Sequence, residues 1–161
     1  MTRRAPDRIR RVDIRAAMDF QSRTPQGVDY SPRRNVQHER FEQRALFAWV
    51  RRQPWADHWA HWPNERRDRG EAMELARQGV RKGMPDNWLL LGVAGRPGAA
   101  SELKRRGVTR SAVSSEQRTW LEHLEAQGWA VGAHRGWDEA AEFFTAYVAG
   151  TWATDGGEWW R

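Results

Sequence analysis

The sequence PDNWLLLGVAGRPGAASELK, residues 85–104, is the stretch that decides the fold. Residues 87–93 form an apolar run suited to a buried strand, and Gly95-Arg96-Pro97-Gly98 is typical of a turn. A second strand is expected over residues 99–104. Because only a short turn separates them, the two strands should pair as neighbours in one sheet.

This predicted pair of strands carries residues suited to hydrolysis. Asp86 opens the first strand and Glu102 lies near the end of the second, so strands about 4.8 Å apart could bring both carboxylates to one cation. Because side chains alternate along a strand, Glu102 and Lys104 should share a face, with Leu103 on the other. Phosphodiester hydrolysis needs carboxylates that hold hard divalent cations, and an ammonium group beside them can orient the attacking water.

Lysine is rare in this chain, which gives Lys104 more weight. Of the 27 basic residues only Lys82 and Lys104 are lysines, and the other 25 are arginines. Because a compact ammonium group and a guanidinium fork are not interchangeable, a chemical reason for lysine is expected at residue 104.

The flanking elements follow from helical periodicity, capping residues and turns. A first helix should begin near His38 and end at Pro54, with an apolar stripe formed by Phe41, Ala45, Ala48 and Trp49. The later elements are a strand over 57–62, a helix over 70–78, a helix from Ser114 or Ser115 to Gly128, a strand over 129–134 and a helix that contains 140–148. This order indicates an α/β fold in which a small mixed β-sheet is flanked by helices.

The composition excludes several classes of protein. The chain of 161 residues has no cysteine, so it can form neither a disulfide framework nor a thiolate zinc site. No apolar run approaches the roughly 20 residues of a membrane span, and the arginine-rich start lacks the apolar stretch of a secretory signal. We therefore expect a cytoplasmic protein, in the host cytoplasm if it is viral, with no membrane contact.

The net charge of +6 lies almost wholly at one end. Residues 1–36 contain nine arginines and four aspartates, hence +5, whereas the remainder has 18 basic and 17 acidic residues. The sequence predicts a flexible basic tail over 1–36, a folded domain over 37–150 and a loose C-terminal tail over 151–161. The basic tail is suited to phosphate contacts, but a purely solubilising role is the alternative.

Further motifs surround the predicted site, and together they resemble one family. Pro85-Asp86 and Glu102-Leu103-Lys104 are similar to the signature of PD-(D/E)XK nucleases. The VRR-NUC branch of that superfamily also has Glu-x-x-x-Gln, Pro-Asn, Gly-Val-x-x-Gly-x-Pro-Asp and Ser-x-x-Gln patterns. This chain matches them in the same order at Glu39 and Gln43, at 63–64, at 79–86 and at 114–117. The resemblance spans about residues 38–148 and is to single-domain viral or phage members.

The resemblance implies a restriction-endonuclease-like core and a DNA endonuclease that depends on Mg²⁺ or Mn²⁺. It implies that Glu39, Asp86, Glu102 and the backbone carbonyl of Leu103 surround the metal. Lys104 would activate water, and Gln117 would support the active site. It also implies a homodimer that acts on branched DNA, such as the four-way junctions of recombination and repair.

Three residues depart from the family pattern. Asn87 and Ser101 stand where apolar residues are common, and Glu65 stands where glycine usually follows the Pro-Asn turn. None of the three replaces an expected ligand, so activity should be retained.

Some of these residues also have a structural interpretation. Glu39 can stabilise a helix dipole, and Glu42 is an alternative to it at the site. Gln117 can make a single buried hydrogen bond with no further role. His58 and His61 would point to opposite faces of a strand, so a histidine zinc site is not expected.

Metal-dependent, structure-selective cleavage of DNA is the function that these residues favour. The competing class is a catalytically inactive nucleic-acid-binding module of the same fold, in a viral replication or packaging assembly. A structural protein with accidental carboxylates would instead hold Asp86 and Glu102 far apart.

Overall fold

A computed structural model describes residues 32–62, 69–152 and 158–161. Its helices and strands follow the predicted order, with short 3-10 turns added between some of them. The predicted basic tail lies outside the described residues up to residue 31, and so do Pro63, Asn64 and Glu65.

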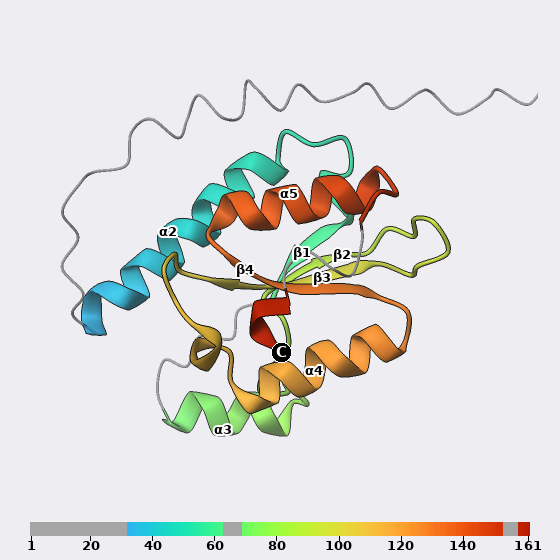
Figure 1. Ribbon diagram of the computed structural model, residues 1–161. Coiled ribbons are helices and arrows are strands. Elements are labelled where there is room, and N and C mark those ends of the chain that lie inside the picture. Colours follow the sequence, from blue (N-terminus) through green and yellow to red (C-terminus); the bar gives the residue numbers. More distant parts are fainter. Residues whose placement is uncertain (1–31, 63–68, 153–157) are drawn as a thin grey trace, which may run out of the picture. The chain divides into compact units, whose positions relative to one another are not determined.

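Four strands form one mixed sheet in the order β1-β2-β3-β4 (Figure 1). The strands are β1 (Trp59–His61), β2 (Asn87–Leu89), β3 (Ala99–Lys104) and β4 (Ala130–Arg135). β2 pairs with β1 and β3 in antiparallel fashion, and β3 pairs with β4 in parallel. The predicted pairing of the strands around the 95–98 turn is therefore confirmed, although β2 ends at Leu89 and not near Val93.

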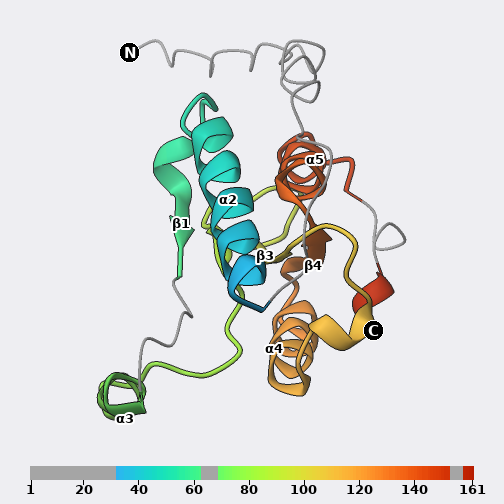
Figure 2. The same cartoon turned by 90° about the vertical axis from the view of Figure 1, so that its left-hand side faces the viewer.

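Helices cover both faces of this sheet. Figures 1 and 2 show α2 (Pro32–Val50) and α5 (Trp137–Val148) on one face and α4 (Ser115–Ala126) on the other. A further helix, α3 (Arg69–Arg77), lies between β1 and β2 in sequence. α2 begins before the expected start near His38, and proline suits the first turn of a helix. Within the described ranges, no helix has the length and apolar character needed to cross a membrane.

The sheet separates two apolar clusters, as strand alternation requires. The cluster beneath α2 and α5 contains the sheet residues Leu89, Ala99, Leu103 and Ala130. The cluster beneath α4 contains the sheet residues Ala100, Val131 and Ala133. Since Leu103 points toward α2 and α5, Glu102 and Lys104 point toward α4, which confirms the predicted alternation along β3.

The prediction of which face of α2 is buried is wrong. Phe41 is 59% exposed and Ala48 is also exposed, whereas Glu42, Leu46 and Val50 are buried. Glu42 points inward because its carboxylate has partners on two other segments. A charged residue therefore occupies an inward position, where apolar residues were expected. Apolar periodicity cannot reveal such a buried charge.

The last described residues pack against the sheet and differ in this from the expected loose tail. The 3-10 turn η4 (Glu158–Trp160) lies beside β4, the edge strand, and Trp160 is 2% exposed. The Trp159 indole N–H donates to the carbonyl of Ala133 (2.8 Å), and Arg161 pairs with Glu125 (2.6 Å). These residues complete the cluster beneath α4.

Replacing Trp160 should therefore cost stability. Trp160→Ala removes a buried indole, and we expect the free energy of unfolding to fall by about 3 kcal/mol. Urea titration followed by circular dichroism measures this. Leu90→Ala is the control, since Leu90 is exposed and its loss should change stability by less than about 0.5 kcal/mol. Equal effects of the two substitutions would show that Trp160 does not belong to the core.

Candidate active site

Asp86 is held in place by both strands that flank β2. Its carboxylate Oδ2 accepts a hydrogen bond from the backbone N–H of Leu103 on β3 (3.1 Å). Its backbone carbonyl accepts one from the N–H of Trp62, directly after β1 (2.7 Å), and lies 2.8 Å from His61 Nδ1. Because a carbonyl oxygen only accepts, Nδ1 of His61 carries the proton of this contact.

Glu102 is almost completely buried, at 1% exposure, and its two carboxylate oxygens differ. Oε1 lies 2.9 Å from the ammonium group of Lys104 and also accepts a hydrogen bond from the side-chain amide of Gln117. Oε2 has no hydrogen-bond partner among the described residues. A buried carboxylate oxygen without a donor is costly, so this position favours a cation.

Gln117 joins two interactions in one side chain. Its backbone N–H donates to Ser114 Oγ (3.2 Å), and its Oε1 accepts from the backbone N–H of Ser114 (2.9 Å). These two bonds form the capping box that starts α4. The Nε2 of the same amide donates to Glu102. The predicted Ser114 cap is confirmed, and the cap fixes the direction from which Gln117 reaches the carboxylate.

The site holds two acids close together, Asp86 and Glu102, beside the positively charged side chain of Lys104. Burial raises the pKa of Glu102 well above its usual value, and the charge of Asp86 raises it further, against the opposing effect of Lys104. Burial likewise raises the pKa of Asp86, and Lys104 opposes that shift. For Lys104, burial lowers the pKa, but the carboxylates of Glu102, Asp86 and Glu39 outweigh it and the net shift is upward. Lys104 is therefore an ammonium group at neutral pH.

The backbone of Leu103 points toward the same place. In a strand the N–H and C=O of one residue face the same edge, and the N–H of Leu103 binds Asp86. The carbonyl of Leu103 therefore also faces the β2 side, beyond the point where β2 begins. The carbonyl of the next residue, Lys104, faces the β4 side, where it accepts a hydrogen bond from the N–H of Gly136 (2.8 Å).

Glu39 and Glu42 occupy different surroundings on α2. Glu39 is exposed and its charge acts on Lys104, so it lies at the edge of the site. Glu42 is buried, accepts from the N–H of Trp137 at the start of α5 (2.9 Å) and pairs with Arg106 (3.3 Å). Its position is explained by helix α5, so it does not replace Glu39 at the site.

The structure thus brings Asp86, Glu102, Lys104 and Gln117 together and leaves Glu39 beside them. Across the described ranges, no group of three or more His, Asp or Glu side chains is arranged to hold one metal ion. The best candidate for a metal site is the pair of acids Asp86 and Glu102, and Lys104 forms an ion pair with Glu102. These carboxylates are close enough for each to shift the pKa of the other, whereas a structural protein with accidental carboxylates would hold them far apart.

The two departures from the family pattern within the described residues have polar partners behind the site. Asn87 Oδ1 accepts from Gln43 Nε2 (2.7 Å), which ties α2 to the residue next to Asp86. Ser101 Oγ lies 2.7 Å from Nδ1 of the buried His134. Burial lowers the pKa of His134 to about 3, so its ring is neutral at pH 7. Neither contact was expected from the sequence, although two polar residues on neighbouring buried strands were the available signal.

Comparison with known proteins places the fold. No family model matches the sequence, and a search of curated proteins gave no match. A solved structure described as a VRR_NUC domain protein aligns with a TM-score of 0.61, at 23% sequence identity, over 70% of this chain and 88% of that one. The fold resembles that of a VRR_NUC domain. The chain is α/β, and its four-stranded mixed sheet flanked by helices agrees with the predicted fold class.

The raised pKa of Glu102 predicts that this site lowers the stability of the protein in a pH-dependent way. A carboxyl group whose pKa is higher in the folded state binds its proton more tightly there, so stability falls as pH rises from 4.5 through the raised pKa. Glu102→Gln should therefore melt at a higher temperature than the parent at pH 7 in EDTA, and the difference should shrink toward pH 4. Glu74→Gln, on the exposed surface of α3, should show no such pH dependence. Lower stability of Glu102→Gln at pH 7 would contradict this.

Proposed function

We propose that this protein is a DNA nuclease that hydrolyses phosphodiester bonds with a divalent metal ion held by Asp86, Glu102 and the backbone carbonyl of Leu103. The observation that carries the proposal is the buried Oε2 of Glu102, which has no hydrogen-bond donor among the described residues. The carboxylate of Asp86 lies close enough to raise the pKa of Glu102. Cation binding would offset both the desolvation and the mutual repulsion of these acids.

The donor set fits Mg²⁺ or Mn²⁺. Two carboxylates and one carbonyl offer only oxygen atoms, and Mg²⁺ commonly binds through one or two carboxylates while it keeps several waters. Glu39, at the edge of the site, is suited to contact such a water or to complete the ligand set. When bound, the cation supplies positive charge that polarises the scissile phosphate and favours ionisation of the attacking water.

The protein's own residues orient the reaction. Gln117 and Lys104 both engage Oε1 of Glu102, which leaves Oε2 for the cation. The N–H of Leu103 holds one oxygen of Asp86 in the same way. The ammonium group of Lys104 has further N–H donors, with which it can orient the attacking water and stabilise negative charge on the phosphate.

DNA is the substrate that the remaining features favour. The fold resembles that of a VRR_NUC domain protein, and the first 36 residues carry +5 of the net charge of +6. Tethered arginines raise the affinity for phosphate without selecting a sequence. The motifs shared with PD-(D/E)XK nucleases extend the proposal to that superfamily, to branched DNA as the preferred substrate and to a homodimer as the active form.

The proposal predicts metal-dependent cleavage that requires three side chains. We expect the parent protein to cut plasmid or four-way-junction DNA in Mg²⁺ or Mn²⁺ but not in EDTA. Asp86→Ala, Glu102→Ala and Lys104→Ala should each reduce the rate by about 100-fold or more. Lys104→Ala should retain DNA binding in a gel-shift assay. Asp57→Ala, an exposed aspartate in the turn before β1, is the control that should cut like the parent.

Two outcomes of this assay would overturn the proposal. Cleavage that survives in Asp86→Ala and Glu102→Ala would place the active site elsewhere. DNA binding by the parent without cuts in either metal would identify a binding module of the same fold.

The basic N-terminal segment should contribute affinity and not chemistry. Deleting residues 1–30 removes seven arginines and four aspartates, and it leaves α2 intact from Pro32 onward. We expect weaker DNA binding and a smaller dependence of affinity on salt concentration, with metal-dependent cleavage retained. Fluorescence anisotropy across a salt series measures the first two quantities. Complete loss of cleavage at saturating DNA would contradict the proposal that this segment contributes affinity and not chemistry.

A further inference from the structure

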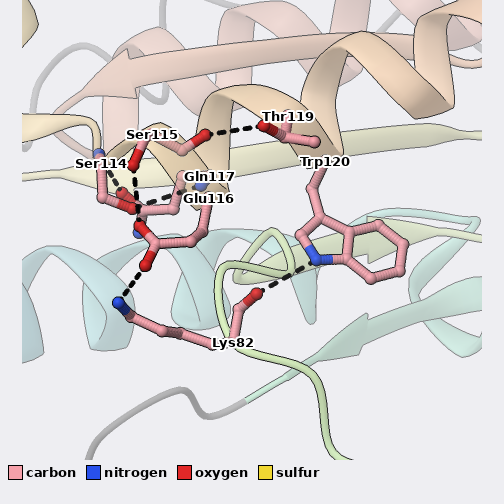
Figure 3. Close-up of polar contacts among 7 residues, drawn as sticks. All are labelled: Lys82, Ser114, Ser115, Glu116, Gln117, Thr119 and Trp120. Atoms are coloured by element: carbon pink, nitrogen blue, oxygen red, sulfur yellow. Dashed lines mark hydrogen bonds and ion pairs between the residues drawn. The ribbon is translucent and has the colours of Figure 1, made fainter.

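A second set of contacts joins the segment that carries Asp86 to the helix that carries Gln117. Figure 3 shows that Lys82 points toward the first turn of α4, where its ammonium group forms an ion pair with Glu116. One turn further along α4, the indole N–H of Trp120 donates to the backbone carbonyl of Lys82 (3.1 Å). The side chain and the main chain of Lys82 are thus both fastened to α4.

Gly83 shows how closely this segment approaches the helix. A Cβ built on Gly83 would lie 2.7 Å from the backbone carbon of Glu116 and 2.9 Å from the backbone nitrogen of Gln117. The φ of Gly83 is +85°, a conformation that also favours glycine. The backbone of residue 83 therefore packs directly against the turn of α4 that contains Gln117.

These contacts complete a closed path around the two carboxylates. On one side, the N–H of Leu103, next to Glu102 on β3, binds the Asp86 side chain. On the other side, Gln117 binds Glu102, and its neighbour Glu116 binds Lys82, which precedes Asp86 by four residues. Between Lys82 and Asp86, the carbonyl of Pro85 accepts from the Trp88 indole N–H (2.8 Å), which restricts the segment further.

This closed path of contacts can hold the two carboxylates in place. The buried carboxylate of Glu102 and the partly buried one of Asp86 repel one another. Because Asp86 lies where a loop enters a short strand, the loop could relieve the repulsion by moving away. We propose that Lys82, Glu116 and Trp120 form a clamp that presets the position of Asp86 relative to Glu102 and so raises the affinity for the divalent cation. The clamp residues are positioning residues, and this inference rests on the proposed function.

The strength of the clamp sets the size of the expected effect. The Lys82 and Glu116 side chains are 57% and 40% exposed, so their ion pair is that of a solvated surface. Exposed ion pairs contribute modestly, and loss of one should weaken cation binding about 2- to 5-fold and not abolish it. Lys82 is also one of only two lysines in the chain, and the other, Lys104, forms an ion pair with Glu102.

The experiment measures Mn²⁺ affinity of the full chain by calorimetry without DNA, together with amide hydrogen exchange of residues 79–86. Glu116→Gln and Lys82→Met should each weaken Mn²⁺ binding about 2- to 5-fold and speed exchange in this segment. The charge-swapped double variant K82E/E116K should restore both quantities toward those of the parent. Glu74→Gln is the matched control, because it breaks the exposed Glu74–Arg77 pair on α3 and should change neither.

The possible failures are distinguishable. Parent-like Mn²⁺ affinity and parent-like exchange in both single variants would overturn the clamp and leave the nuclease proposal intact. A defect confined to Lys82→Met and seen only in DNA binding would also overturn it, since Lys82 would then be a phosphate contact. If the parent chain itself binds no Mn²⁺, the proposed function fails, and the role of the clamp in cation binding fails with it.

Discussion

Two acids of like charge, Asp86 and Glu102, lie together where water is largely excluded, and the surrounding structure compensates for that burial. Strand pairing sets the spacing, the N–H of Leu103 holds one carboxylate, and Lys104 and Gln117 hold the other. Burial raises the pKa of both acids, and the charge of Asp86 raises that of Glu102 further, so two ionised carboxylates are unfavourable here without a positive charge between them. A divalent cation would resolve this cost, and for that reason the chemistry and the folding of the site are linked.

Much of this arrangement follows from local sequence. The turn at 95–98 makes β2 and β3 neighbours, and alternation along β3 puts Glu102 and Lys104 on one face. The Ser114 cap and the start of α4 are equally local, because the capping box involves residues three apart. Short-range rules therefore predict the order of the elements and bring most of the proposed site residues to one place.

Long-range polar contacts could not be predicted in the same way. Glu42 turns inward because its partners, Trp137 and Arg106, belong to distant segments, so the apolar pattern of α2 predicted the wrong face. The pairs Gln43 with Asn87 and Ser101 with His134 also join residues far apart in the sequence. The burial of Trp160 depends on an edge strand that only the folded sheet provides. In each case the deciding partner is remote in sequence.

Locating the bound ion is the most direct test of the idea that this pair of acids exists to hold a cation. Crystals grown with Mn²⁺ would reveal the ion by its anomalous scattering. We predict one peak about 2.1 Å from a carboxylate oxygen of Asp86, from Oε2 of Glu102 and from the carbonyl oxygen of Leu103. An anomalous map with no peak between these atoms, at a Mn²⁺ concentration that supports cleavage, would contradict the account.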